Sequence, residues 1–501
     1  MSAQAKSALE VEPISLDASQ PRWRAAASRW LDREGLIVVV VAAYAITSLV
    51  RSNDQLFSDG WLALLAGREI VQHGLPSHDT LALWTQGRRW VDEQWLGQLA
   101  LYGLSRLGGI RLALLTHVGL SVTAFAGGAV LARKRDASPR AVTWIALVAL
   151  LPYYMSSSVM RTQSFAYPLF VAVLWLLASD SRAPSRRVFL VLPLLILWAN
   201  LHGSVVLAAG LVALAGVAGA LAKARVASPR SWLPRSAALA LLPWPCLFVS
   251  PYALQLPHYY REVLFNPGFG HYVSEWTPTT LSLVTIPFFL LAAASLWTLG
   301  RAGDRFTLFE RIALLALLAL SFLAIRNVVW FVLASLTLVP PGLTAVLGER
   351  GSAATKRLNV LLGGSAVAGT ALILVLAAAH RDSWFRSAYP TLAADKIAAA
   401  AGERGHLFAN EAFADWLMWE HPTLEGRVAW DTRFELLTEA QVTQIADFRS
   451  RVGDWRRIAQ GYAVFALDPA DERKQGQALL AEPGARLLFE NKQIIAIAVP
   501  S

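Results

Sequence analysis

Carboxylates and arginines stand at the ends of several apolar segments of this chain, where a membrane surface would bring them together. Asp59 follows the first apolar segment, Arg161 follows the third in the stretch SSSVMRTQSF, and Arg326 separates the ninth from the tenth. A carboxylate can act as a general base toward a hydroxyl, and arginine can hold a phosphate through two parallel hydrogen bonds. Together these residue types fit the transfer of a sugar from a lipid-phosphate carrier.

Other polar residues fall on the same side of the predicted membrane. They are His202 in LWANLHGS, Asp92 and Glu93 in the first long loop, and Tyr252 and Glu275 in the loop after the seventh segment. Charged groups near hydrocarbon are costly and usually face a protein interior or a water-filled cavity. Any one of them alone could equally be a helix cap, a side chain that reaches the interface or half of an ion pair. Because five separate segments bring such residues to one side of the membrane, together they predict a polar site.

The composition is that of a membrane protein. Hydrophobic residues make up 55% of the 501 residues, charged residues make up 16%, and the mean hydropathy is +0.43. Water-soluble domains carry about 25% charged residues, so these values exclude an ordinary soluble enzyme and a disordered chain. The single cysteine, Cys246, excludes an intramolecular disulfide and a cysteine-based zinc site.

The net charge of +10 is explained by membrane topology. Residues 381–501 carry −3, from 14 basic and 17 acidic residues, so residues 1–380 carry +13. Basic clusters such as Arg133-Lys134-Arg135 fall in loops on the side of the N-terminus, as the positive-inside rule requires of cytoplasmic loops. The N-terminus is therefore expected in the cytoplasm. No basic run with interleaved aromatic residues predicts a nucleic-acid partner.

Eleven apolar segments are predicted to span the membrane. They are 35–50, 110–132, 141–159, 164–179, 187–200, 203–222, 236–250, 281–299, 310–325, 327–347 and 358–380. We therefore expect a polytopic α-helical membrane protein with a cytoplasmic segment 1–34 and a transmembrane domain 35–380, whose first outer loop is 51–109. Segment 95–107 could be a twelfth span, but an interfacial or re-entrant helix is preferred because another span would reverse the sides of the basic loops.

An odd number of spans places residues 381–501 outside the cytoplasm, where their composition indicates a small α/β domain. Short strands are predicted at 406–409, 427–431, 462–467, 486–489 and 493–499, and helices at 391–403, 412–420 and 439–451. About 120 residues are enough for a core of its own. Asp431 and Arg433 in this tail are expected to pair with each other or to contact an acceptor.

Motifs of several other protein classes are missing from the sequence. It has no Walker A motif, no GxGxxG and no HExxH, so ATP hydrolysis, dinucleotide binding and zinc proteolysis have no support. A transporter of lipid-linked substrates would place ionisable groups near the membrane midplane and would show internal repeats. The sequence has almost no such groups and no convincing repeat, so a transporter is the weaker alternative.

A series of short motifs resembles a bacterial branch of the GT-C class of polyprenyl-phosphate-sugar glycosyltransferases. The opening pattern of that branch, roughly D-x-D-x-W-W-H-x-x-x-G-R and then G-x-P-W-x-x-H-E-W-L, corresponds to FSDGWLALLAGR at 57–68 and GRRWVDEQWL at 87–96. Further matches are RTQSF at 161–165, LWANLHG at 197–203, SPY at 250–252, SEWTP at 274–278, RN at 326–327 and VAWDTRFEL at 428–436. The order and spacing of these motifs cover nearly the whole chain.

The resemblance implies a glycosyltransferase of the bacterial inner membrane that serves envelope glycan or glycoconjugate assembly. Its expected donor is a polyprenyl-phosphate-linked sugar, and its expected acceptor is a glycan, a lipid or a protein outside the cytoplasm. With the residue chemistry above, the candidate roles are catalytic base for Asp59, donor-phosphate binding for Arg161, Arg326 and His202, reserve acids in Asp92 and Glu93, and acceptor contacts for Tyr252, Glu275, Asp431 and Arg433.

The chain departs from the pattern of this branch at four positions. Phe57 replaces the first aspartate, Leu62 the second tryptophan, Ala63 the histidine and Gln94 the glutamate. Because the paired acid is missing, a metal site of the Asp-x-Asp type is not expected. No cofactor is predicted, and a divalent cation stays the alternative. A non-catalytic protein of the same fold in a polysaccharide assembly system is the second hypothesis for function.

Overall fold

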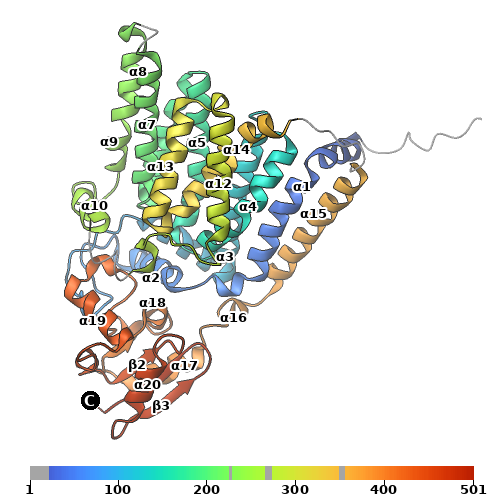
Figure 1. The fold of residues 1–501 in the computed structure, drawn as a ribbon. Helices are drawn as coiled ribbons and strands as arrows, with labels where there is room; N and C mark the ends of the chain where they lie inside the picture. The colour runs from blue at the N-terminus through green and yellow to red at the C-terminus, as the bar shows by residue number, and fades with distance from the viewer. Residues whose placement is uncertain (1–21, 225–227, 266–272, 349–355, 501) are drawn as a thin grey trace, which may run out of the picture.

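The computed structural model describes residues 22–224, 228–265, 273–348 and 356–500. Within them, a bundle of helices occupies one end of the molecule, and a small mixed sheet with its own helices occupies the other (Figure 1). Residues 1–21 of the predicted segment 1–34 lie outside the described ranges. We call residues 382–500 the C-terminal unit.

The helices of the bundle coincide with the predicted spans. They are α1 (Arg22–Val50), α3 (Trp95–Arg133), α4 (Pro139–Ser157), α5 (Ala166–Arg182), α6 (Val191–Leu201), α7 (Val205–Lys223), α8 (Pro229–Leu241), α9 (Pro243–Leu247), α12 (Ile286–Arg301), α13 (Leu308–Leu323), α14 (Val328–Leu347) and α15 (Lys356–Ala379). Among the described residues, six helical segments are long and apolar enough to cross a membrane: Ala26–Val50, Trp95–Arg133, Thr162–Arg182, Val205–Lys223, Ile325–Leu347 and Arg357–Ala379. The remaining predicted spans correspond to helices that are shorter or less apolar. The chain is thus a helical membrane protein, while the count of eleven spans stays a prediction.

Helix α14 lies at the centre of the bundle. In its apolar segment, 83% of the residues are buried inside the protein. Trp330, in the first turn of α14, contacts the rings of Tyr167, Phe170 and Trp198 with centroid distances of 5.8, 5.1 and 5.8 Å. Such aromatic clusters pack tightly and resist rearrangement. They therefore fix the start of α14, where Arg326 precedes the helix.

Segment 95–107 is the first part of helix α3. A kink at Gly108 and Gly109 separates it from the rest of that helix. Gly109 has a φ of +75°, and a Cβ at this position would collide with the carboxylate of Asp382. That carboxylate accepts a hydrogen bond of 3.1 Å from the backbone N–H of Ile110. The kink therefore needs a glycine and joins α3 to the first residue of the C-terminal unit. Whether 95–107 spans the membrane stays a prediction.

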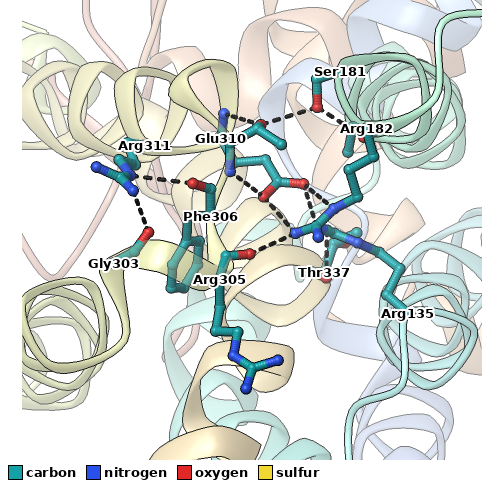
Figure 2. Close-up of polar contacts among 11 residues, drawn as sticks. Arg135, Ser181, Arg182, Gly303, Arg305, Phe306, Glu310, Arg311 and Thr337 are labelled. Atoms are coloured by element: carbon teal, nitrogen blue, oxygen red, sulfur yellow. Dashed lines mark hydrogen bonds and ion pairs between the residues drawn. The ribbon is translucent and has the colours of Figure 1, made fainter.

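A buried ion-pair cluster holds the helices together at the end that faces away from the C-terminal unit. Glu310, which is fully buried, pairs with Arg135 and with Arg182, the latter at 2.8 Å (Figure 2). Arg182 also donates a hydrogen bond of 2.7 Å to the carbonyl oxygen of Arg305. Two cations on one carboxylate leave a net positive charge here, in keeping with the basic character of this end.

The C-terminal unit contains a four-stranded sheet in the order β1-β2-β4-β3. Its elements are α16 (Asp382–Phe385), α17 (Thr391–Ala401), β1 (Leu407–Ala409), α18 (Glu411–Glu420), α19 (Glu439–Ser450), β2 (Val464–Leu467), α20 (Arg473–Leu480), β3 (Arg486–Glu490) and β4 (Ile495–Ala498). Strand β1 pairs with β2 in parallel, and the other two pairings are antiparallel. Four of the five predicted strands are confirmed. The strand predicted at 427–431 is wrong, because only Val428 forms isolated bridges, to Leu407 and Ala82.

Helix α2 (Ser58–His73) lies between the bundle and the C-terminal unit and shares a core with the latter. Trp61 of α2 is fully buried and lies against Tyr389 with a centroid distance of 5.2 Å. The guanidinium of Arg68 donates hydrogen bonds of 2.8 and 2.9 Å to the carbonyl oxygens of Met418 and Trp419. The segment between α1 and α3 is thus fastened to the C-terminal unit by buried contacts.

Candidate functional site

A cavity of about 530 Å³ lies where the bundle, α2 and the C-terminal unit meet. Seven of the ten candidate residues line it: Asp59, Glu93, Arg161, His202, Glu275, Arg326 and Arg433. Helix α10 (Leu256–Phe265) and the short 3-10 helix η4 (Ser274–Trp276) add further wall. The structure therefore gathers most of the candidates in one place, while their chemical roles stay predictions.

Asp59 lies in the first turn of α2 and lines the cavity. The N-cap position of the helix is Phe57, and no side chain caps the helix there. Oδ2 of Asp59 lies 3.3 Å from the guanidinium of Arg161. The alternative that Asp59 is the cap of α2 does not fit this geometry.

Arg161 joins two carboxylates. Its guanidinium lies 3.3 Å from Oδ2 of Asp59 and 2.7 Å from Oε1 of Glu275. The backbone of Arg161 is extended, with a φ of −156°, just before the 3-10 helix η2 (Thr162–Phe165). The ion pair with Glu275, which the sequence left open as an alternative, is thus present. One cation shared by two acids positions both of them.

The pKa values of the two acids that pair with Arg161 are shifted in opposite directions. Asp59 keeps 38% of its side-chain exposure inside the cavity, but the protein around the cavity still raises its pKa by desolvation. Arg161 acts against that rise, and Glu275 adds to it. Glu275 is desolvated too, but Arg161 and Arg326 bring the pKa of Glu275 below its ordinary value. Opposed shifts of this kind let one carboxyl accept a proton while the other stays charged.

Arg326 forms no direct ion pair with any residue that the structure describes, although its charge acts on Glu275 and Asp59 at longer range. It belongs to the 3-10 helix η6 (Ile325–Asn327), immediately before α14. Its guanidinium carbon lies 4.4 Å from the centre of the Trp276 ring. This stacking orients the guanidinium. Because Arg161 is directly paired with two acids and Arg326 is not in a direct ion pair within the described ranges, Arg326 is the guanidinium on this wall that is better placed to contact an incoming anion.

His202 is neutral and presents a hydrogen-bond donor. Burial, assisted by Arg326 and Arg161, lowers the pKa of His202 to about 3. Its Nδ1 accepts a hydrogen bond of 3.1 Å from the backbone N–H of Ser204. The ring proton must then reside on Nε2. His202 can donate a hydrogen bond to a phosphate or hydroxyl oxygen, but it adds no charge.

Glu93 and Glu435 form a second, acidic wall of the cavity. Burial and the neighbouring Asp92 raise the pKa of Glu93 to about 8, and Tyr259 forms a hydrogen bond with its carboxyl group. Burial and Glu93 raise the pKa of Glu435 to about 8. Neither acid is in an ion pair within the described part of the chain. Neither Glu435 nor Tyr259 is among the ten residues singled out from the sequence, although Glu435 lies inside the tail motif.

Arg433 connects the C-terminal unit to the segment between α1 and α3. It pairs with Asp431, as the sequence allowed, and with Asp79 at 2.6 Å. Its guanidinium carbon lies 4.3 Å from the centre of the Trp90 ring. Nη1 of this buried side chain has no hydrogen-bond partner among the described residues. Arg433 therefore positions the wall of the cavity through its buried ion pairs.

Three candidate residues lie outside the cavity lining. Asp92 is 1% exposed and lies behind Glu93, and Asp431 is taken up by Arg433. The hydroxyl of Tyr252 donates a hydrogen bond of 2.8 Å to the carbonyl oxygen of Pro76. Within the described ranges, no group of three or more His, Cys, Asp or Glu residues could hold a metal ion.

The chain resembles known proteins in its structure, as comparisons with solved structures show. No protein-family model matches the sequence, and no curated protein matches it by sequence. The crystal structure of ArnT from Cupriavidus metallidurans in the apo state is similar over 94% of this chain and 98% of that one, with a TM-score of 0.54 and 14% identity. The structure of the same protein bound to undecaprenyl phosphate is similar over 92% and 97%, with a TM-score of 0.52 and 14% identity.

A second solved protein has a similar architecture. The apo oligosaccharyltransferase from Archaeoglobus fulgidus is similar over 89% of this chain and 71% of that one, with a TM-score of 0.53 and 11% identity. At such low identity these similarities establish the fold. The chain therefore has the fold of the GT-C glycosyltransferases, as its motifs predicted.

Proposed function

We propose that this protein transfers a sugar from a polyprenyl-phosphate donor to an acceptor hydroxyl outside the cytoplasm. The observation that carries the proposal is the cavity in which Asp59 and Glu275 flank Arg161 beside Arg326. This cavity provides a carboxyl group whose pKa is raised and, in Arg326, a guanidinium that forms no direct ion pair with a described residue. Support also comes from the shared fold with ArnT, whose solved complex contains undecaprenyl phosphate.

In the proposed reaction, the acceptor oxygen attacks the anomeric carbon of the sugar from the face opposite the phosphate. The bond between that carbon and the phosphate oxygen breaks, and its electron pair leaves with the polyprenyl phosphate. Asp59 takes the proton of the attacking hydroxyl and acts as general base. The configuration at the anomeric carbon is inverted. Glu275 stays ionised and, through Arg161, keeps the base in place.

Donor binding is assigned to Arg326, His202 and the apolar residues beside them. Arg326 would contact the phosphate and balance the charge that develops on the leaving group. The Nε2–H of His202 would donate a further hydrogen bond. Val206, Leu207 and Leu320 also line the cavity and would accommodate the first carbons of the prenyl chain.

Acceptor binding is assigned to the acidic wall and the C-terminal unit. Glu93, Glu435 and Tyr259 can hydrogen-bond the hydroxyl groups of a glycan, a lipid headgroup or a protein side chain. Arg433 lines the same region and would hold it in place. Tyr252 and Asp431 would act through the residues they support.

The proposed topology has eleven spans in a bacterial inner membrane, with the N-terminus in the cytoplasm and the C-terminal unit outside. It can be tested by cysteine labelling in a Cys246→Ser background. Ser138→Cys and Ser387→Cys should react from opposite sides of the membrane. Labelling of both from one side would contradict the topology.

The catalytic proposal is tested by Asp59→Asn. This change keeps the size of the side chain but removes the base, so transfer from a polyprenyl-phosphate sugar should fall by about 10²–10⁴-fold. Asp54→Asn is a matched control, because Asp54 pairs with Arg51 at the surface and does not line the cavity. Equal activity of Asp59→Asn and the parent would assign the base elsewhere, with Glu93 and Asp92 as the next candidates.

A non-catalytic role in polysaccharide assembly is the second candidate. It is favoured by the departures from the GT-C pattern, because Phe57, Leu62, Ala63 and Gln94 all line the cavity. The wall thus has apolar or neutral groups where the pattern has an acid, a histidine and a second acid. A parent protein that supports envelope assembly in cells but transfers no sugar from any lipid-phosphate donor would favour this alternative.

A further inference from the structure

A second cavity lies on the other flank of the bundle, between α1, α3 and α15. It has a volume of about 610 Å³, and we call it the α1–α3–α15 groove. Ala42, Ala126 and Ala371, one from each helix, leave the space that larger side chains would fill. Val130 and Val367 on its rim are 50% and 52% exposed. The groove is therefore open toward the surroundings of the bundle and is separate from the candidate active site.

The groove has the length of one membrane leaflet. It follows α1 from Trp30 to Ala45. Fifteen helical residues rise about 22 Å. Half of a bilayer, hydrocarbon and headgroups together, is roughly 20–22 Å thick. A single phospholipid standing upright beside α1 would thus match the groove from end to end.

The charged end of the groove lies where the chain leaves α3. Trp30, Glu34, Arg133 and Lys134 line that end, and the rest of the lining is apolar apart from one threonine. Glu34 accepts hydrogen bonds of 2.7 to 3.0 Å from the guanidinium of Arg133, so these two charges cancel. Lys134 is exposed, and it forms no ion pair with any residue in the described ranges. The ammonium of Lys134 lies 5.9 Å from the centre of the ring of Trp175 in α5.

We infer that the α1–α3–α15 groove binds one phospholipid of net negative charge, with an acyl chain along the alanine-lined floor and the phosphate at Lys134. The net charge of the polar end is +1, which favours an anionic headgroup over a zwitterionic one. The charge of Glu34 is already compensated by Arg133, so it attracts the amine of a zwitterionic lipid less strongly. Basic groups that lie between membrane helices near the membrane surface bind the headgroups of anionic lipids.

Such a lipid would support the helix that leads to the C-terminal unit. Only 11% of the apolar segment of α15 is buried inside the protein. Helix α15 packs mainly against α1, at the edge of the bundle (Figure 1). A chain in the groove would contact α1, α3 and α15 together and so join α15 to the bundle. This inference does not depend on the proposed catalytic function.

The test uses the purified full-length protein, stripped of lipid in detergent and incubated with equal amounts of phosphatidylglycerol and phosphatidylcholine. Native mass spectrometry should show one retained phosphatidylglycerol per chain, in preference to phosphatidylcholine. Lys134→Gln should reduce that preference by about five-fold, since one lysine near a membrane surface is lost. Lys223→Gln is the matched control, because Lys223 ends α7 and does not line the groove.

A second variant tests the apolar floor. Ala126→Phe would fill the groove and should remove the retained lipid, while Lys134 stays in place. Equal retention of both lipids by the parent would overturn the inference. So would equal effects of Lys134→Gln and Lys223→Gln. If Ala126→Phe folds and keeps its preference for phosphatidylglycerol, the lipid binds elsewhere. If it does not fold, the comparison of the two lysine variants decides.

Discussion

Replacing Glu275 by glutamine should shift the pH dependence of sugar transfer, because Glu275 and Asp59 share Arg161. The fork of one guanidinium places the two carboxylates roughly 6 Å apart. At that separation, two like charges repel by about 0.7 kcal/mol in bulk water and about 2.8 kcal/mol at an effective dielectric constant of about 20. The side chains of Asp59 and Glu275 are 38% and 39% exposed, so screening by water keeps the effect near the lower value. Loss of the Glu275 charge should therefore lower the pKa of Asp59 by about 0.5–1 unit.

The assay is the pH profile of kcat/KM for transfer from a polyprenyl-phosphate sugar. A base with a lower pKa is deprotonated at lower pH, so the acid limb of the Glu275→Gln profile should move down by that amount. Glu262→Gln is the matched control, because Glu262 is an exposed residue of α10 that pairs with His258 and does not line the cavity. An acid limb that stays in place, or moves up, would refute the assignment of Asp59 as the group that titrates.

Three further predictions follow from the same geometry. Arg326→Lys keeps the charge but loses the planar fork, so KM for the donor should rise several-fold with little change in melting temperature; an unchanged KM would place the phosphate elsewhere. Glu93 and Glu435 have folded-state pKa values of about 8, above those of the unfolded chain, so stability should fall as pH rises from about 4.5 to about 8. Glu435→Gln should make that fall in melting temperature smaller, and an unchanged slope would contradict the coupling. Gly109→Ala should lower the melting temperature, because the positive φ and the carboxylate of Asp382 leave no room for a Cβ; an unchanged melting temperature would mean that the kink can relax.

Those residues of the cavity that lie at the ends of apolar segments could be predicted from the sequence. Asp59, Arg161 and Arg326 were found because each follows or separates apolar segments, and a bilayer forces such positions to one level. Glu435 could not be found in this way, since its place in the cavity depends on how the C-terminal unit docks. Asp92 and Glu93 were equivalent in the sequence, but only Glu93 lines the cavity. These two residues lie at the turn that leads into α3, and the tertiary fold decides which of them faces the cavity.

Local sequence patterns predicted most helices and strands of the C-terminal unit. The elements that they predicted wrongly or missed have physical explanations. The predicted strand at 427–431 follows the turn at Gly426, where φ is +72°, and Asp431 then leaves the sheet to bind Arg433. Only Val428 between them forms ladder bridges. Helix α20 was missed because it is short and mostly polar. Its burial comes from packing against β4, which local patterns do not reveal.

The contacts of Arg68 set an order of events during synthesis. Its guanidinium is held by the carbonyl oxygens of Met418 and Trp419 and by Glu425, which leave the ribosome about 350 residues after Arg68 itself. At about 5–20 residues per second, translation of that interval takes roughly 20–70 seconds. During this time α2 can pack against α3 but lacks its partners in the C-terminal unit, and the wall with Arg433 does not yet exist. The cavity is thus completed only at the end of chain growth, so a truncated product would reach the membrane without a formed site.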